Sequence, residues 1–248
     1  MKKTLFKHRS IRKFKPTPIP EEVLRDVLEA AMRASTCGNM QLYSLVVTRD
    51  KTLRERLSPC HFNQPMVLQA PCVVTVCADV HRFSMWCKQR NASPAYDNLA
   101  WFLNASTDAL LAAQNLIIEA ELNGLGICVL GTTIYTAGDI AHILELPSGV
   151  IPLTTIVMGY PDEDPELTDR LPLNGVVHYE KYVDYTAAEI DELWAEREAS
   201  EETKRLLEEN DLPNLARIFT ERRYVKDDNL AISKSYFALM KEKGFFNN

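Results

Sequence analysis

Residues 98–130 read NLAWFLNASTDALLAAQNLIIEAELNGLGICVL, and this stretch decides the fold. Its first 25 residues, up to Leu122, predict one long helix with apolar residues spread around most of its circumference. A helix of that kind lies inside a protein or at a subunit interface. Gly124 and Gly126 follow it and are typical of a helix end. The residues Ile127–Leu130 then predict a strand, so that helix and sheet follow each other directly.

More strands and helices are predicted on both sides of this stretch. The segment Val73–Ala78 does not alternate between apolar and polar residues, so we expect both faces of that strand to be buried. Strands that alternate with helices in this way indicate a protein built in layers. The other predicted strands are Leu42–Thr48 and Leu153–Met158, and the other predicted helices are Glu21–Ala31, Leu53–Leu57 and Thr136–Leu144, the last opened by a capping box from Thr136 to Asp139. Residues 79–97 are irregular, and we predict a loop or lid region with short helices there.

The character of the chain changes after Tyr185. Thr186 and Glu189 have the spacing of a capping box, and charged, helical sequence follows to the end. We predict helices at Glu189–Glu209, Leu215–Arg223 and Leu230–Lys243, packed on the core or on a partner chain. The chain is therefore divided into a core, residues 1–185, and a helical extension, residues 186–248.

The composition is that of an ordinary globular protein. Of the 248 residues, 46% are hydrophobic and 25% are charged, and the formal net charge is −6. An acidic surface argues against wholesale binding to nucleic acid or to an anionic membrane, but it leaves room for one small cationic pocket that binds a phosphate. We therefore predict neither a nucleic-acid partner nor a membrane partner.

The cysteines and the N-terminus favour a reduced, cytoplasmic protein. There are six cysteines and no C-x-x-C pair, and Cys72, Cys77 and Cys128 lie in apolar runs that predict buried thiols. The first residues contain two lysines but no apolar stretch of the kind that follows them in a signal peptide. We also find no run of about 20 apolar residues, the length that spans a bilayer.

Several common catalytic motifs are missing. The chain has no G-x-G-x-x-G after a strand, no P-loop and no G-x-S-x-G. The five histidines show no metal-ligand spacing, so no metal site is predicted. No acid–base pair stands out either, and no side chain is predicted to be catalytic.

The residues Arg9-Ser10-Ile11-Arg12-Lys13-Phe14 do stand out. In an extended segment, the guanidinium groups of Arg9 and Arg12 with the hydroxyl of Ser10 between them suit a phosphate and a polyol chain. The alternative is a solvated basic loop, and these residues alone leave both readings open.

Five motifs in order along the chain resemble the nitroreductase family. Arg-Ser-Ile-Arg-x-Phe is similar to its opening signature, and the segment Ala34–Gln41 is similar to its A-P-S-x-x-N-x-Q, with Ser35 in place of the proline. The other three are Ala70-Pro71 before a strand, Gly124-Leu125-Gly126 after the long helix and Gly159-Tyr160-Pro161. The resemblance covers residues 5–180.

The resemblance implies an α+β fold: a three-layer sandwich with a mixed, mostly antiparallel sheet flanked by helices, here with a C-terminal helical extension. It implies a homodimer that holds FMN tightly at the subunit interface, with NAD(P)H as a transient electron donor. Carried over position by position, the resemblance assigns Arg9, Ser10 and Arg12 to the phosphate, the ribityl chain and the pyrimidine side of the flavin, and Arg170 to the phosphate. It assigns Thr36, Cys37, Gly38 and Asn39 to a segment that reaches the flavin from the partner subunit, with Gln41 nearby. It places Asn63 at the edge of the flavin ring, and Leu130 and Gly131 in the segment that passes the isoalloxazine.

The chain also departs from the family pattern. Thr168 and Met66 stand where some members have a second phosphate-binding cation and a lysine near N1 and O2 of the flavin. The cation that would stabilise reduced flavin is therefore open, with Arg9 as our candidate. Other readings also stay open: Cys37 as a buried inert thiol, Gly124 and Gly126 as helix terminators only, Asn63 as a turn residue, and Arg170 as a surface ion-pair residue.

The implied activity is hydride transfer from NAD(P)H through flavin N5 to a nitroaromatic or quinone-like acceptor, by a ping-pong mechanism. One alternative is a specialised member, a reductive dehalogenase or a flavin-consuming enzyme, with Trp86, Tyr96 and Trp101 near the lid as substrate contacts. A second alternative is a non-catalytic flavin-binding protein whose helical extension recruits a partner. The sequence decides neither the acceptor nor the choice between NADH and NADPH.

Overall fold

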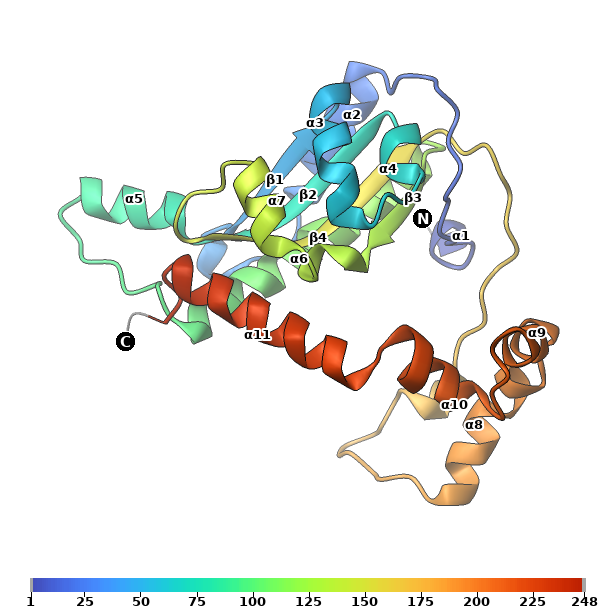
Figure 1. Ribbon diagram of the computed structural model, residues 1–248. Helices are drawn as coiled ribbons and strands as arrows, with labels where there is room; N and C mark the ends of the chain where they lie inside the picture. The colour runs from blue at the N-terminus through green and yellow to red at the C-terminus, as the bar shows by residue number, and fades with distance from the viewer. Residues whose placement is uncertain (1, 247–248) are drawn as a thin grey trace. The chain divides into compact units, whose positions relative to one another are not determined.

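The computed structural model describes residues 2–246, and its centre is a four-stranded sheet (Figure 1). The strands are β1 (Tyr43–Thr48), β2 (Cys72–Asp79), β3 (Gly126–Leu130) and β4 (Val150–Gly159). Their order is β1-β2-β4-β3, and each neighbouring pair is antiparallel. One parallel bridge, from Ser10 to Ile127, adds the N-terminal segment to the free edge of β3. The predicted α+β fold with a mostly antiparallel sheet is confirmed.

Helices cover both faces of the sheet, which makes the three layers. The long helix α6 and the helix α2 pack on one face, and short helices pack on the other. The helices of this part are α1 (Lys2–Leu5), α2 (Glu21–Ala31), α3 (Lys51–Leu57), α4 (Met66–Gln69), α5 (His81–Gln89), α6 (Leu99–Leu122) and α7 (Ala137–Ile143), with the 3-10 turns η1 (Cys37–Asn39), η2 (Ser58–His61) and η3 (Gly131–Ile134).

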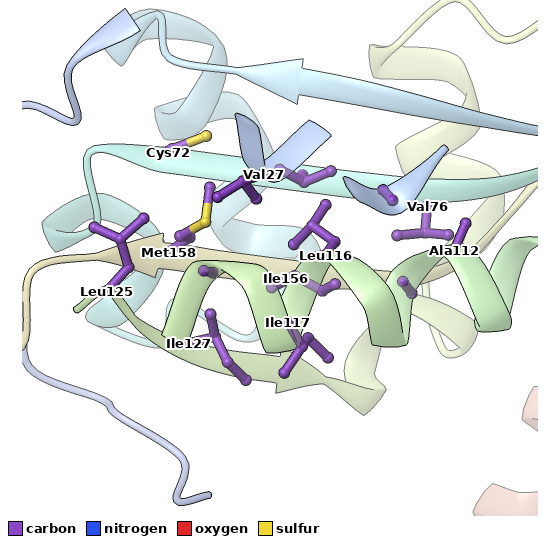
Figure 2. Close-up of a cluster of buried hydrophobic side chains, with 14 of the residues drawn as sticks. Val27, Cys72, Val76, Ala112, Leu116, Ile117, Leu125, Ile127, Ile156 and Met158 are labelled. Atoms are coloured by element: carbon purple, nitrogen blue, oxygen red, sulfur yellow. The ribbon is translucent and has the colours of Figure 1, made fainter. Parts of the chain in front are cut away.

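The largest hydrophobic cluster lies between α6 and the sheet. Figure 2 shows Leu116 and Ile117 of α6 against Ile156 of β4 and Ile127 of β3. The small residues on the same helix, such as Ala112, allow α6 to approach the strands closely. The strand β2 is buried on both faces along its whole length, as its unalternating sequence predicts.

A second cluster, on the opposite face, ties the N-terminal segment to the sheet. It contains Ile11 and Phe14 together with residues of α4, β2, β3 and β4. Burying an aliphatic or aromatic side chain contributes about 1.5–3 kcal/mol. Hydrophobic burial therefore fixes the segment that carries Arg9, Ser10 and Arg12 along β3.

The C-terminal residues contribute to the core as well. Phe245 is completely buried, and its ring lies 5.2 Å from the ring of Phe102 on α6. The backbone N–H of Gly149 donates to the carbonyl of Lys243 at 2.8 Å. The end of the chain therefore closes one end of the hydrophobic core, in the same cluster as Leu42.

By its internal contacts the chain forms two compact units. The first runs to Glu166 and resumes at Ile232, and the second is Leu167–Ala231. The helices of the second part of the chain are η4 (Leu173–Gly175), α8 (Ala187–Ala199), α9 (Glu201–Asn210), α10 (Leu215–Ile218), η5 (Phe219–Arg223) and α11 (Lys226–Glu242), of which α11 continues into the first unit. The division of the chain at residue 185 stays a prediction.

Three local predictions differ in outcome. The capping box of Thr186 and Glu189 is confirmed. The single helix predicted over Glu189–Glu209 is wrong, because the chain turns at Ser200, whose side chain accepts the N–H of Thr203 and starts α9. The capping box predicted at Thr136 is also wrong, because its hydroxyl donates to the carbonyl of Cys60 instead.

Within residues 2–246, every helix is too short or too polar to cross a membrane.

Candidate functional site

Two glycines allow the N-terminal segment to dock on the sheet. The N–H of Ile11 donates to the carbonyl of Ile127 at 2.8 Å. A Cβ on Gly126 would lie 2.6 Å from Cγ1 of Ile11, and a Cβ on Gly159 would lie 2.5 Å from Cδ of Pro71. Real Cβ atoms do not approach other atoms so closely. Gly126 is therefore required if Ile11 is to pack on β3, and Gly159 is required chiefly for the close approach of Pro71, with Phe14 of the segment next at 3.2 Å.

Gly124 has a different structural role from Gly126: it ends the helix α6. Its φ is +74°, and the backbone N–H groups of Gly124 and Leu125 donate to the carbonyls of Glu121 and Ala120. This pattern is the Schellman motif, in which a left-handed glycine ends a helix. The reading of both glycines as helix terminators only is therefore correct for Gly124 and wrong for Gly126.

The side chains of the docked segment alternate between two sides. Arg9 and Ile11 line a cavity of about 340 Å³ together with Glu121 of α6. Arg9 is paired there: Nη1 lies 2.5 Å from Oδ1 of Asp164 and donates to the carbonyl of Pro165 at 2.7 Å. Beside it, His8 Nδ1 lies 2.5 Å from Oε1 of Glu121.

Ser10 and Arg12 lie on the other side, next to Cys128 of β3. Burial raises the pKa of the Cys128 thiol, while the positive charge of Arg12 and a hydrogen bond from Ser10 oppose that rise. The side chain of Arg12 is exposed, and its backbone N–H donates to Oε1 of Glu163. An exposed guanidinium beside a hydroxyl can bind an anion.

The end of β3 lies next to this segment. Leu130 is 2% exposed and belongs to the same cluster as Ile11. Gly131 follows at the start of η3, and a Cβ on it would meet no atom within 4 Å. The chain therefore presents bare backbone to open space at Gly131, as a surface for a flat ring requires.

The turn η2 brings Asn63 to the neighbourhood of η3. His61 Nδ1 and Thr132 Oγ1 form a hydrogen bond of 2.9 Å, and Thr136 Oγ1 donates to the carbonyl of Cys60 at 2.7 Å. Asn63 follows η2 with a φ of +54°, and its backbone N–H donates to the carbonyl of Ser58. The turn reading of Asn63 is thus correct for its backbone.

His61 is fully buried, and burial lowers its pKa to about 4. The fold therefore favours the neutral ring, while an unfolded chain titrates near a pKa of about 6.5. The stability that neutral His61 contributes is complete above pH 6.5 and is lost as the pH falls from 6.5 towards 4. We expect the free energy of unfolding in urea to fall across this window, and to fall less in His61→Asn. Parallel pH profiles for the two proteins would contradict this expectation.

The segment Thr36–Gln41 lies against α6 and α2. Asp108 of α6, only 2% exposed, accepts the N–H of Cys37 at Oδ1 and the N–H of Leu42 at Oδ2, at 2.9 and 3.1 Å. Gly38, Asn39 and Gln41 all have positive φ. A buried carboxylate therefore holds an unusually twisted loop at both ends.

Cys37 is exposed, so the prediction of a buried thiol at this position is wrong. It lies in η1, at the surface of the twisted loop. The predicted burial of Cys72, Cys77 and Cys128 is confirmed. Burial raises the pKa of the first two to about 12, which keeps these thiols protonated and unreactive.

The structure brings only some of the predicted site residues together. Five of them lie on β3, directly after it or on the segment docked against it: Arg9, Ser10, Arg12, Leu130 and Gly131. Asn63 follows η2, which contacts η3. The loop carrying Thr36, Cys37, Gly38, Asn39 and Gln41 forms a separate group, and Met40 and Gln41 line a cavity of about 540 Å³ with β1 and α2. Arg170 belongs to the second compact unit, where it donates to Thr168 Oγ1 at 2.6 Å.

Two residues of this region were missed by sequence reasoning. Asp108 interrupts an otherwise apolar helix, and a lone acid in such a helix is a signal for a buried backbone acceptor. His61 was considered only as a metal ligand, and nothing in its sequence neighbourhood points to Thr132, which is 71 residues away.

Comparison with known proteins adds independent findings. The family model described as "Nitroreductase family" matches residues 5–160. The FMN reductase (NADPH) of Bacillus subtilis (strain 168) is 32% identical over 181 residues, which cover 72% of this chain and 73% of that protein. The NADPH-dependent oxidoreductase of Staphylococcus aureus (strain MRSA252) is 33% identical over 180 residues, 71% of each chain.

Solved structures agree over nearly the whole length. A crystal structure from Bacteroides fragilis NCTC 9343 has a TM-score of 0.97 and 49% identity, and covers 98% of this chain and 99% of its own. The NfrA1 nitroreductase of B. subtilis has a TM-score of 0.86 and 26% identity, and covers 99% of each. With the docked N-terminal segment, its two glycines and the layered sheet, these matches lead to one conclusion: the chain belongs to the nitroreductase family.

Proposed function

We propose that this chain is an FMN-dependent oxidoreductase that passes hydride from NAD(P)H, through N5 of the flavin, to a small organic acceptor such as a nitroaromatic or a quinone. The observation that carries the proposal is the docking of the segment with Ser10 and Arg12 on β3 at Ile127, together with the open backbone at Gly131, which follows the other end of the same strand. Relatives named for the same chemistry support it, among them the FMN reductase (NADPH) of B. subtilis.

The residues present fit a flavin mononucleotide. A phosphate needs a cation that is not already neutralised, and the exposed guanidinium of Arg12 meets this need better than Arg9, which is paired with Asp164. A flat ring needs a wall without protruding side chains, and Gly131 provides one. Arg12 and Ser10 would hold the phosphate and the ribityl hydroxyls, and Leu130 and Gly131 would lie along the ring.

The redox chemistry is supplied by FMN when it is bound, through hydride transfer at N5. The chain contributes binding and orientation. Buried Leu130 anchors the end of β3 in the core, so that it would hold the backbone beside it in place for the ring, and the neutral ring of His61 would add no charge near it. Because the chemistry needs no acid–base dyad from the chain, one pocket can serve donor and acceptor in turn, which is a ping-pong mechanism.

We also propose a homodimer. The helix α6 is apolar around most of its circumference, and five leucines on it are 45–57% exposed: Leu99, Leu103, Leu110, Leu111 and Leu122. Monomeric proteins rarely expose such a continuous apolar surface. In a dimer, the loop Thr36–Gln41, which packs on the same helix, would reach the flavin of the partner subunit.

The test is a visible spectrum of the purified protein, followed by anaerobic addition of NADPH or NADH. We expect a flavin spectrum that bleaches with the donor and returns when a quinone or a nitroaromatic is added. A protein that takes up no FMN contradicts the proposal. Flavin that binds but is reduced by neither donor would instead support a non-catalytic flavin-binding protein.

A specialised activity is the second candidate, and a specific observation favours it. Beyond β2, an aromatic group is formed by Phe83, Trp86, Tyr96 and Trp101, with neighbouring ring centroids 4.6–5.3 Å apart. Trp86 on α5 is 52% exposed. Such rings can bind an aromatic substrate. Turnover of a halogenated aromatic without turnover of quinones would favour this candidate.

Replacing the phosphate-binding arginines should weaken FMN binding. A charge-assisted hydrogen bond contributes about 1.5–3 kcal/mol, so we expect Arg12→Ala and Arg170→Ala each to raise the Kd of FMN about tenfold or more. Fluorescence titration of FMN-free protein measures this. Arg25→Ala, which removes an exposed arginine paired with Glu29 on α2, is the control and should leave the Kd unchanged. If Arg170→Ala behaves like the control, the assignment of Arg170 to the phosphate is wrong.

A further inference from the structure

The turn η3 is held from behind by three threonines. Thr132 bonds to His61, and Thr136, just after the turn, donates to the carbonyl of Cys60. Thr133 donates to the carbonyl of Leu130 and forms a hydrogen bond with the hydroxyl of Thr155, both at 2.9 Å. Gly131, in contrast, faces open space. The threonine hydroxyls therefore bond to neighbouring parts of the protein, whereas the space beside Gly131 is left open.

Two of these hydrogen bonds, those of Thr132 and Thr136, and one contact between aromatic rings join η3 and the residues after it to η2. The hydrogen bond between His61 and Thr132 measures 2.9 Å, and the rings of Phe62 and Tyr135 lie 5.9 Å apart. Thr136 also donates to the carbonyl of Cys60. Cys60, His61 and Phe62, which are consecutive, therefore each contact η3 or the two residues after it. The position of η2 relative to η3 is therefore fixed at several points.

The chain leaves η2 in a conformation that depends on this anchoring. Phe62 and Asn63 have φ values of +56° and +54°. Neither residue is glycine, and the left-handed region is disfavoured for a bulky side chain such as that of Phe62. The N–H groups of Phe62 and Asn63 donate to the carbonyls of Pro59 and Ser58, within η2. Where Asn63 lies is thus set by where η2 lies.

The burial of His61 leaves one of its two ring nitrogens without a hydrogen bond among the described residues. The residue is 0% exposed, and the nitrogen without a partner there is Nε2. A buried polar atom without a hydrogen-bond partner destabilises the fold, and a leucine or phenylalanine in place of the histidine would avoid that loss. The polar contact that the histidine gains in return is the bond to Thr132.

We propose that His61 is a positioning residue of the flavin site: through Thr132 it sets the spacing between η2, from which the chain leads into Asn63, and η3, which begins at Gly131. This inference rests on the proposed function. The spacing matters because a rigid ring binds tightly only between surfaces that are already in place, and a loosened surface must be ordered on binding. The residue acts through η3 and does not itself contact the flavin.

Four variants of the full chain test this inference: His61→Asn, His61→Gln, Thr132→Val and the double variant His61→Gln/Thr132→Val. The amide of asparagine can occupy the place of Nδ1, whereas glutamine places its amide near the position of Nε2. We expect Thr132→Val and His61→Gln each to raise the Kd of FMN about five- to tenfold. His61→Asn should stay within about twofold of the wild type, and the double variant should bind no worse than the weaker single variant.

The control is Thr48→Val, the same substitution at another buried threonine whose hydroxyl has no partner among the described residues, on β1. Its Kd for FMN should not change. A second readout is the visible spectrum of the bound flavin, which reports the surroundings of the ring and should shift in Thr132→Val and not in Thr48→Val. Thermal unfolding of all variants separates this effect from loss of the fold.

Two results would overturn the inference. One is an unchanged Kd and spectrum in Thr132→Val, even if the variant melts earlier, because the bond would then be merely structural. The other is additive loss in the double variant, because the two residues would then act independently. A wild-type protein that binds no FMN has a different meaning: it contradicts the proposed function itself.

Discussion

Gly126→Ala is expected to displace the Arg9–Phe14 segment from β3 and to weaken FMN binding far more than tenfold. The added Cβ would lie 2.6–3.0 Å from three atoms of the Ile11 side chain. Ile11 has little room to retreat, because it is 5% exposed and packed in the cluster with α4. Overpacking a core of this kind costs about 1–3 kcal/mol, and the displaced segment takes Ser10 and Arg12 with it.

The expected effect of Gly126→Ala is measured by FMN titration and by urea unfolding of the FMN-free chain. The matched control is Gly138→Ala on α7, where a Cβ would meet no atom within 4 Å. Alanine is favoured over glycine inside a helix, so the control should be as stable as the wild type or slightly more stable. Should Gly126→Ala bind FMN as the control does, the docked segment would not be part of the cofactor site.

Asp108→Ala should destabilise the protein by about 2–4 kcal/mol and free the loop Thr36–Gln41. The carboxylate of Asp108 is the acceptor for two backbone N–H groups, those of Cys37 and Leu42, one at each end of the loop. Removing it leaves both donors without their acceptor. The positive φ values at Gly38, Asn39 and Gln41 would then relax.

Urea unfolding measures the stability of Asp108→Ala, and alkylation of the exposed thiol of Cys37 follows the loop. We expect faster alkylation than in the wild type. Asp26→Ala, on an exposed position of α2, removes an acid without removing a buried acceptor and should change neither property. Unchanged stability in Asp108→Ala would mean that water replaces the carboxylate at both N–H groups.

Local periodicity predicted most of the central layers. The long helix was expected at 98–122 and is Leu99–Leu122, because a 24-residue helix gives the apolar pattern many turns in which to repeat. A strand at Val73–Ala78 was expected because its sequence is apolar without alternation, and β2 is indeed buried on both faces. The turn at Ser200 was missed, because the charged helix continues in pattern through it and only the side-chain bond to Thr203 ends one helix and starts the next.

The candidate site was predictable where its residues are neighbours in sequence. Arg9, Ser10 and Arg12 lie within one docked segment, so one motif was enough to propose them together, and their part in flavin binding stays a prediction. The positions of Asn63 and Gly131 relative to each other depend on a bond between residues 71 apart, which no local pattern encodes. Asp108 and the loop that it holds are likewise separated by 66–71 residues.

The buried position of Phe245 has a consequence for how the chain folds. The cluster that contains Leu42 also contains Leu239, Met240 and Phe245, which lie about 200 residues further along the chain. Contacts between parts of a chain that are so far apart form slowly, because a long loop must close first. The apolar surface around Leu42 therefore stays uncovered until this distant segment has packed on it, and uncovered apolar surface makes folding intermediates prone to aggregate.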